Sequence, residues 1–245
     1  YYGEPAVSYY IQTEGKKILF DTGYSDVLIR NAELMGIDLK AVDDIVISHS
    51  HNDHTRGLQF LNEYMDLSEV ELISHPNCFV KKYVDGLYIG PPYVGDEIAK
   101  ITNYKPSRGI KRLTERLYFL GEIPRTNDFE NLTPIGVAEN EGRFEDDYNM
   151  DDTALVYNGD HGIFVITGCS HSGICNIVDY AKYVCDEERV TGVLGGFTTY
   201  SAFSNETFSL LRDGHIGYAI TYIAASILLG LLATLLGYFS PKVFY

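Results

Sequence analysis

The sequence predicts a mixed α/β fold followed by a long hydrophobic helix, and two observations lead to this prediction. In the first part of the chain, short apolar runs alternate with helical patterns, an order typical of α/β domains. Near the end, residues 216–239 contain no charged side chain and are rich in Leu, Ile, Ala and Gly. A length of 245 residues suits one large domain with an appendage.

Eight segments are predicted to be strands because each is a short, mainly apolar run next to turn residues. They are residues 7–12, 17–21, 44–48, 70–74, 117–120, 153–157, 162–166 and 190–194. The first two are expected to form a hairpin around the turn Glu14–Gly15.

Helices are expected between several of these strands. Ser25 is predicted to cap the first helix, and Gly36 to end it. A second helix is expected directly after the strand at 44–48, and a third at 173–185, where apolar residues fall on one face. Residues 81–112 are rich in Gly, Pro and Tyr without clean periodicity, so we predict a long loop over the active-site face.

The motif His49-Ser50-His51-Asn52-Asp53-His54 holds three of the seven histidines and follows the predicted strand at 44–48. In extended backbone His49 and His51 point the same way, and the helix that begins at Asp53 turns back toward them. Neutral imidazoles and a carboxylate are preferred ligands of a catalytic divalent metal, zinc above all. A polar loop that is merely rich in histidine is the alternative, but this spacing favours a metal site.

This His-x-His-x-Asp-His motif after a hydrophobic strand resembles the signature of the metallo-β-lactamase-fold hydrolases. Residues 19–23, Leu-Phe-Asp-Thr-Gly, are similar to the family's early strand that ends in Asp-x-Gly. Residues 165–171, Val-Ile-Thr-Gly-Cys-Ser-His, are similar to a later strand that runs into a Cys- and His-bearing loop. Residues 121–125 (Gly-Glu-Ile-Pro-Arg), 129–130 (Phe-Glu) and 151–155 (Asp-Asp-Thr-Ala-Leu) further resemble the dihydropterin-ribofuranosylaminobenzene-phosphate synthase subfamily. The resemblance covers about residues 5–197 and implies an αββα sandwich, two β-sheets between helices.

The resemblance also implies a ligand set for two divalent metal ions, for which we expect zinc, with iron or manganese as alternatives. The expected ligands are His49, His51 and His171 for one ion, and Asp53 and His54 for the other. Cys169 stands where related folds place a bridging Asp or Cys, and a small buried residue at a strand end is the equal alternative. Asp21 is expected to accept a hydrogen bond from a ligand imidazole or a backbone amide of the loop that carries residues 49–54, which we call the metal loop.

The chemistry expected at such a site is hydrolysis by water whose pKa the metal lowers to about 7. Asp53 and His54 are the expected catalytic residues, with Asp53 as a proton acceptor. Arg125 and Glu122 are the expected substrate contacts, because a guanidinium suits bidentate recognition of phosphate or carboxylate. A structural ion pair of Arg125 with Glu122 or Glu130 is the alternative. The expected substrate is a small molecule, phosphorylated or pterin-like.

Composition limits partners and location. The formal net charge of −15 argues against nucleic acid as a general partner, because phosphate backbones require a positive surface. Four cysteines are too few and too scattered for a disulfide framework and fit a reducing cytosol. We therefore expect a cytoplasmic hydrolase domain, and the sequence gives no indication of its oligomeric state.

Residues 195–210 resemble the third-helix signature of the fluoride channels, the Fluc or CrcB family, and this resemblance extends to about residue 240. It implies a sodium-binding helix break at Thr198 and Thr199, and fluoride-path rings at Tyr200 and Phe203. The family usually has Phe in place of Tyr200, and its first two spans are not found in this sequence. Residues 216–239 exceed the roughly 20 apolar residues that cross a bilayer, so a membrane-spanning helix is predicted, with a buried core helix as the alternative.

The two resemblances meet at Gly195-Gly196-Phe197. In the hydrolase subfamily these three residues are followed by His-Leu and then by a C-terminal segment that completes the domain. This chain has Thr198 in place of that His, and its sequence does not match the C-terminal segment. We therefore expect a C-terminally truncated sandwich at 1–197. At 198–245 we expect a channel-like fragment that is membrane-associated if the helix at 216–239 inserts. The chain is interpreted as a chimera of two incomplete proteins, with a natural fusion as the alternative. A metal-dependent hydrolase or synthase is the expected function, and a fluoride-channel fragment that does not function alone is the alternative.

Overall fold

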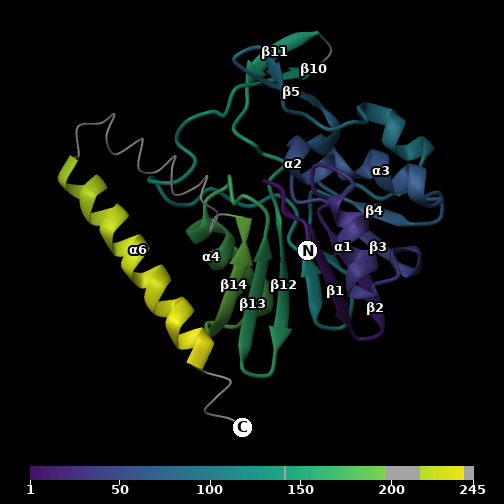
Figure 1. Cartoon of the computed structure of the whole chain (residues 1–245). Helices are drawn as coiled ribbons and strands as arrows, with labels where there is room; N and C mark the ends of the chain where they lie inside the picture. Colours follow the sequence, from purple (N-terminus) through teal and green to yellow (C-terminus); the bar gives the residue numbers. More distant parts are fainter. Residues whose placement is uncertain (141, 197–215, 240–245) are drawn as a thin grey trace. The chain divides into compact units, whose positions relative to one another are not determined.

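The computed structural model describes residues 1–140, 142–196 and 216–239, except for the side chains of 229 and 233–239. The chain divides into two compact units, Tyr1–Phe197 and Thr198–Tyr245. The first unit contains all the described strands, and the second contains one helix, α6 (Ile216–Phe239) (Figure 1).

Three sheets form the first unit. The first sheet has the order β1 (Tyr9–Thr13), β2 (Lys16–Phe20), β3 (Asp44–Val46), β4 (Glu71–Ile73) and β7 (Asn103–Tyr104). The second has the order β14 (Val190–Gly195), β13 (Gly162–Thr167), β12 (Ala154–Gly159), β9 (Leu117–Phe119) and β8 (Lys111–Arg112). The third, which we call the small sheet, has the order β11 (Arg143–Asp146), β10 (Val137–Asn140), β5 (Lys81–Val84) and β6 (Leu87–Tyr88).

The two five-stranded sheets pack face to face, and the alternation of side chains along each strand explains why. In β2, Ile18 and Phe20 join a buried cluster with Phe119 and Leu155 of the second sheet. Leu19, between them, points to the opposite face and joins a different cluster. A strand that is buried on both faces reads as a continuous apolar run, which is what residues 18–20 show.

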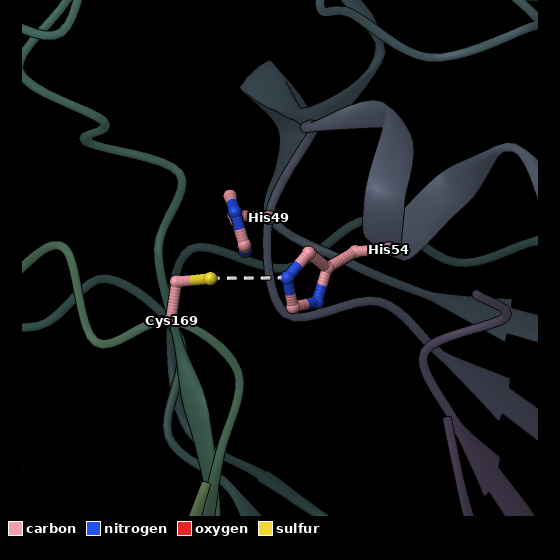
Figure 2. Close-up of side chains that lie close together, drawn as sticks. All are labelled: His49, His54 and Cys169. Atoms are coloured by element: carbon pink, nitrogen blue, oxygen red, sulfur yellow. Dashed lines mark hydrogen bonds between the residues drawn. The ribbon is translucent and has the colours of Figure 1, made fainter. Parts of the chain in front are cut away.

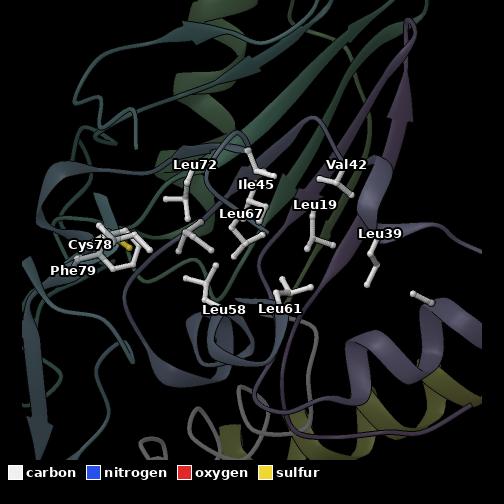
Figure 3. Packing of buried hydrophobic residues seen from close by; sticks show 14 residues of the cluster. Leu19, Leu39, Val42, Ile45, Leu58, Leu61, Leu67, Leu72, Cys78 and Phe79 are labelled. Atoms are coloured by element: carbon white, nitrogen blue, oxygen red, sulfur yellow. The ribbon is translucent and has the colours of Figure 1, made fainter. Parts of the chain in front are cut away.

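Helices cover the outer faces of this sandwich. Four α-helices belong to the described part of the first unit: α1 (Val27–Met35), α2 (Asn52–Thr55), α3 (Gly57–Tyr64) and α4 (Ile174–Cys185). Leu58 and Leu61 of α3 pack against Leu19 and Leu72 of the first sheet (Figure 3). Ile177 of α4 joins a cluster with strands of the second sheet. The predicted αββα arrangement of a mixed α/β fold is therefore confirmed.

Local sequence signals located most of these elements. The hairpin turn forms at Glu14 and Gly15, which have φ values of 49° and 82°, the left-handed region that such two-residue turns require. Gly36 ends α1 in the left-handed conformation, as predicted. Short 3₁₀ turns at Leu39–Ala41, Pro76–Phe79 and Gly95–Lys100 connect other elements.

The prediction of a long loop at residues 81–112 is wrong. The segment holds β5, β6, β7 and β8, which join three different sheets. Each of these strands has two to four residues, too few to show a period of two in the sequence. Their existence depends on partners that are distant in the chain, such as β10 for β5.

The second unit contains the helix predicted at 216–239, with the same bounds. Within the described residues, however, no helix meets the length and apolarity needed to cross a membrane, so the predicted membrane span is not supported. Thr198, Thr199, Tyr200 and Phe203, the residues expected to be channel-like, lie outside the described residues.

Candidate metal centre

The predicted ligands lie where strands of both large sheets end. The loop with His49 and His51 follows β3, and α2 then carries Asp53 and His54. Cys169 and His171 follow β13 of the opposite sheet. β2 and β3 run parallel, so Asp21, which follows β2, emerges beside the loop that follows β3. The carboxyl ends of strands in an open sheet are the usual place for a binding site.

One group of possible ligands contains His49, His51 and His171, whose ring nitrogens lie within 4.8 Å of one another. The ring centroids of His49 and His171 are 4.7 Å apart, and those of His51 and His171 are 4.8 Å apart. Nε2 of His49 and Nε2 of His171 are buried and have no hydrogen-bond partner within the described residues. An unsatisfied buried nitrogen costs about 1–3 kcal/mol, so this donor set fits a divalent metal ion.

A second group contains His49, His54 and Cys169 (Figure 2). Sγ of Cys169 lies 3.1 Å from Nε2 of His54. Oδ2 of Asp53 lies 3.4 Å from the same nitrogen, although Asp53 belongs to neither group of converging ligand atoms. Cys169 and Asp53 thus each approach Nε2 of His54 within 3.4 Å, and His49 belongs to both groups.

Asp21 holds the metal loop from behind. It is fully buried, and its Oδ2 accepts a hydrogen bond from Nδ1 of His54 at 2.6 Å. Its Oδ1 accepts from the backbone amide of Ser48 at 2.7 Å. The hydroxyl of Ser48 donates to Oδ2 of Asp21 and lies 3.0 Å from Nδ1 of His49. These contacts leave Nε2 of both histidines to face the ligand groups, as is usual for metal-binding imidazoles.

The segment 147–153, between β11 and β12, supports the same loop from the other side. Asp151 is buried and accepts from the backbone amide of Ser50 at 2.8 Å. The side-chain amide of Asn149 lies 3.2 Å from Nε2 of His51, which leaves Nδ1 of His51 as the ligand atom. Sequence reasoning noted residues 151–155 only as part of a resemblance and missed Asn149, because these contacts join residues about a hundred positions apart.

Burial and neighbouring charges set the protonation of the donors. Burial lowers the pKa of His49 well below its usual value and lowers that of His51 to about 3, so both rings are neutral, as metal ligands must be. Burial would also lower the pKa values of His54 and His171, but Asp21 at His54 and Cys169 at His171 outweigh it and raise them, so a bound metal ion would displace a proton from each ring. Burial would raise the pKa of Cys169, but hydrogen bonds with His171 and His54 outweigh it and lower that pKa, which favours the thiolate.

Arg125 and Glu122, the predicted substrate contacts, do not pair with each other. The guanidinium of Arg125 donates to the carbonyl oxygens of Ile123 and Asn149 at 2.6 and 2.9 Å. Glu122 accepts from Nε2 of His75 at 3.0 Å and from Arg108 at 2.6 Å. Within the described residues, Arg125 forms no ion pair with Glu122 or with Glu130. Glu130 instead accepts from the backbone amides of Cys175 and Asn176, in the first turn of α4.

A cavity of about 660 Å³ has Arg125 in its lining, and it reaches residues that contact the ligand segments, although none of the described lining residues is itself a predicted metal ligand. Its wall also includes Lys82 and Asp151, and Asn131, whose amide donates to the carbonyl oxygen of His171. Glu122 is not among the described residues that line it. This volume is within the range of small-molecule sites.

Known proteins resemble this chain over most of its length. An uncharacterized protein of Methanocaldococcus jannaschii is 32% identical over a match that covers 80% of this chain and 73% of the length of that protein. A crystal structure is known for Tm1679, described as a metal-dependent hydrolase of the β-lactamase superfamily. Its sequence is 30% identical, the match covers 80% of this chain and 73% of the Tm1679 chain, and the TM-score is 0.63. The family model of the metallo-beta-lactamase superfamily matches residues 1–68. The chain belongs to the metallo-β-lactamase superfamily.

Within this superfamily, the chain is similar to the 7,8-dihydropterin-6-methyl-4-(beta-D-ribofuranosyl)-aminobenzene-5'-phosphate synthase of Methanocaldococcus jannaschii. The identity is 29% over 86% of this chain and 76% of the synthase. The resemblance to that subfamily, which the sequence motifs indicated, is therefore confirmed.

The C-terminal part is similar to a different family. The model described as CrcB-like protein, Camphor Resistance, matches residues 156–238. A fluoride-specific ion channel of Thermus thermophilus is 55% identical over 19% of this chain, and the match spans 37% of the channel. A fluoride-specific ion channel of Methylobacillus flagellatus is 42% identical over 30% of this chain, and the match spans 60% of it. The chain thus spans less than two thirds of these channel relatives.

Proposed function

We propose that residues 1–197 form a metal-dependent hydrolase or synthase that acts on a small molecule, phosphorylated or pterin-like, through a metal-activated water. One observation carries the proposal: imidazoles from two opposite sheets converge, and Nε2 of His49 and of His171 are buried without a hydrogen-bond partner in the described residues. The four cysteines are free, which supports a cytoplasmic location for this part of the chain.

The residues that would hold metal fall into two sets. His49, His51 and His171 would hold one divalent ion, and His54, Asp53 and Cys169 would hold a second. Zinc suits imidazole and thiolate ligands best, and iron or manganese are alternatives. When bound, such ions lower the pKa of a coordinated water to about 7 and polarise the bond to be broken.

The chain's own residues would orient the reaction and move the proton. Asp53 and His54 are the proposed catalytic residues. About a third of the Asp53 side chain is exposed (34%), so it can meet a substrate and accept a proton at Oδ2. Burial would raise the pKa of Asp53, but the hydrogen bond and charge of His54 outweigh it and lower that pKa, so the carboxylate is ionised.

The cavity lined by Arg125 is the proposed substrate pocket. Its wall contains more carboxylates than cations, and Lys82 is already paired with two of them. A phosphate would therefore bind through the metal ions and Arg125, whereas an N–H-rich ring such as a pterin would suit the acidic wall. Glu122, held by His75 and Arg108, is proposed as a secondary contact at the edge of this region.

Metal analysis and turnover of the intact chain test this proposal. We expect about two metal ions per chain and hydrolysis of a chromogenic phosphodiester that stops when a chelator is added. His171→Ala should lose at least one ion and most activity, whereas His161→Ala, an exposed residue of the β12–β13 turn, should lose neither. Purified protein that retains no zinc, iron or manganese after dialysis against each of them would refute the proposal.

A fluoride-channel fragment is the second candidate function, favoured by the family match at residues 156–238 and by the identity of 55% to a fluoride-specific ion channel over 19% of the chain. We propose that this part does not conduct fluoride alone. The test is fluoride efflux from liposomes that contain the intact chain, followed with a fluoride electrode. We expect the rate of empty liposomes, and a clearly faster rate would contradict this.

A further inference from the structure

The small sheet contains a lysine whose environment differs from that of a surface lysine. Lys82 of β5 is 1% exposed, although lysine is almost never fully buried unless it is paired. Its ammonium lies 2.7 Å from Oδ1 of Asp151 and 2.8 Å from Oδ2 of Asp147. Burial would lower the pKa of Lys82, but these two carboxylates outweigh it and raise that pKa, so the ammonium is charged.

Each carboxylate leads from Lys82 to the metal loop. Asp151 uses its other oxygen to accept from the amide of Ser50, between His49 and His51. Asp147 accepts from the backbone amide of Asn149 at 2.8 Å, and the Asn149 side chain contacts Nε2 of His51. Two chains of polar contacts therefore run from one ammonium group to the same histidine-bearing loop.

The backbone of this region also lies against the loop. Ile89, which follows β6, donates from its amide to the carbonyl of Lys82 at 2.9 Å, and its own carbonyl accepts from the amide of Asn52 at 2.8 Å. The β5–β6 hairpin is thus attached to the loop by main-chain contacts as well. A side-chain change at Lys82 would leave these main-chain contacts in place.

We propose that Lys82 is a positioning residue for the metal centre, and that it fixes the orientation of the His51 side chain through Asp151 and Asp147. This inference rests on the proposed metal function of the loop. A removed ammonium would leave two buried carboxylates facing each other without a cation, a strongly unfavourable arrangement. The carboxylates would separate or take up protons and water, and the Ser50 amide and the Asn149 side chain would move with them.

The experiment compares Lys82→Met with Lys81→Met in the intact chain. Lys81 is the neighbouring residue, is partly exposed and pairs at 3.4 Å with Glu139 on the surface of the small sheet, so it is a matched control. Each variant is titrated with Co²⁺, and the affinity and the visible absorption bands are recorded. Exchange of the Ser50 amide with solvent is measured in the metal-free protein.

We expect Lys82→Met to weaken Co²⁺ binding by about 10–100-fold, to shift the absorption bands and to speed Ser50 amide exchange. Lys81→Met should match the wild type, and Lys82→Arg should restore most of the affinity because it keeps the charge. Wild-type affinity, bands and exchange in Lys82→Met would overturn the inference. If the wild type itself bound no metal, the proposed function would fail. In that case the exchange rate of the Ser50 amide would still test the role of Lys82, and an unchanged rate in Lys82→Met would overturn the inference.

A folding failure is also informative. If Lys82→Met does not fold, the double variant Lys82→Met/Asp147→Asn, with one carboxylate neutralised, takes its place in the same measurements. If neither variant folds, the role of Lys82 is structural and the proposal is overturned.

Discussion

At the scale of the residue, the candidate metal ligands could be predicted from the sequence. Most of the residues that hold these ligands in place through hydrogen bonds could not. His49, His51 and His54 are recognisable because histidine is scarce in this chain and three lie within six positions. Asp21 was found through its motif, and the structure places it against the loop. Ser48, Asn149 and Lys82 are ordinary residues in the sequence, because their roles come from contacts with distant segments. Whether the converging side chains bind metal stays a prediction.

Asp21→Ala should weaken metal binding by about 10–100-fold, because His54 would lose the carboxylate that orients its ring. Competition with a chromogenic zinc chelator measures this. Asp26→Ala, which removes a surface ion pair with Arg30, is the control. Equal zinc affinities of Asp21→Ala and the wild type would contradict the expected role.

Asn149→Leu should also weaken zinc binding, and Asn149→Asp should retain it. A His51 that binds metal through Nδ1 carries its proton on Nε2, which needs an acceptor, and an amide or carboxylate oxygen at position 149 provides one. The amide nitrogen of Asn149 lies 3.2 Å from Nε2 of His51, and the amide oxygen is buried without a hydrogen-bond partner in the described residues. A 180° rotation of the amide would bring this oxygen to His51. The same zinc competition measures both variants. Equal loss in both would exclude the acceptor role.

At the scale of the element, helices and longer strands follow from local patterns, and short strands do not. Gly36, the hairpin turn and the apolar face of α4 each carry a signal within a few residues. The small sheet has no such signal, because β5 pairs with β10 more than fifty positions away. The region predicted as a loop is therefore the one that supplies Lys82, which also lines the cavity.

The junction of α2 and α3 depends on close contact with the first sheet. A Cβ atom at Gly57 would lie 1.8 Å from the carbonyl oxygen of Thr22, a clash with backbone that cannot easily yield. Gly57→Ala should therefore lower the free energy of unfolding by about 1–3 kcal/mol, the usual cost of overpacking. Urea unfolding measures this. Gly109→Ala, where a Cβ meets open space, should change it by less than about 0.5 kcal/mol.

At the scale of the whole molecule, two sequences with different relatives share one chain. The family of residues 1–197 was predictable because its motifs recur at the ends of strands, and Tm1679 has the same fold. The nature of residues 198–245 rests on relatives alone, because the described part of that unit is the single helix α6. The division of the chain into two functional domains at 197 therefore stays a prediction.

Metal should stabilise the chain as a whole, because the folded state binds it and the unfolded state lacks the converged site. At free zinc of about 1,000 times the dissociation constant, the gain is roughly 4 kcal/mol. Thermal unfolding in excess zinc and in chelator measures the gain. In the control His49→Ala, which lacks the residue common to both ligand groups, the gain should be smaller than in the wild type. A wild-type midpoint that does not respond to zinc would contradict a resident metal.

The membership of His49 in both ligand groups has a consequence for the order of loading. Ser48 occupies the Nδ1 side of His49, so a single ring nitrogen, Nε2, faces both groups. One lone pair cannot serve two ions at once, so the two positions compete for it. If two ions bind as proposed, the ion held by His49 would share it with His51 and His171, and the other would have only His54, Asp53 and Cys169. Under that proposal we expect a zinc titration to show two unequal equivalents, one tight and one weak.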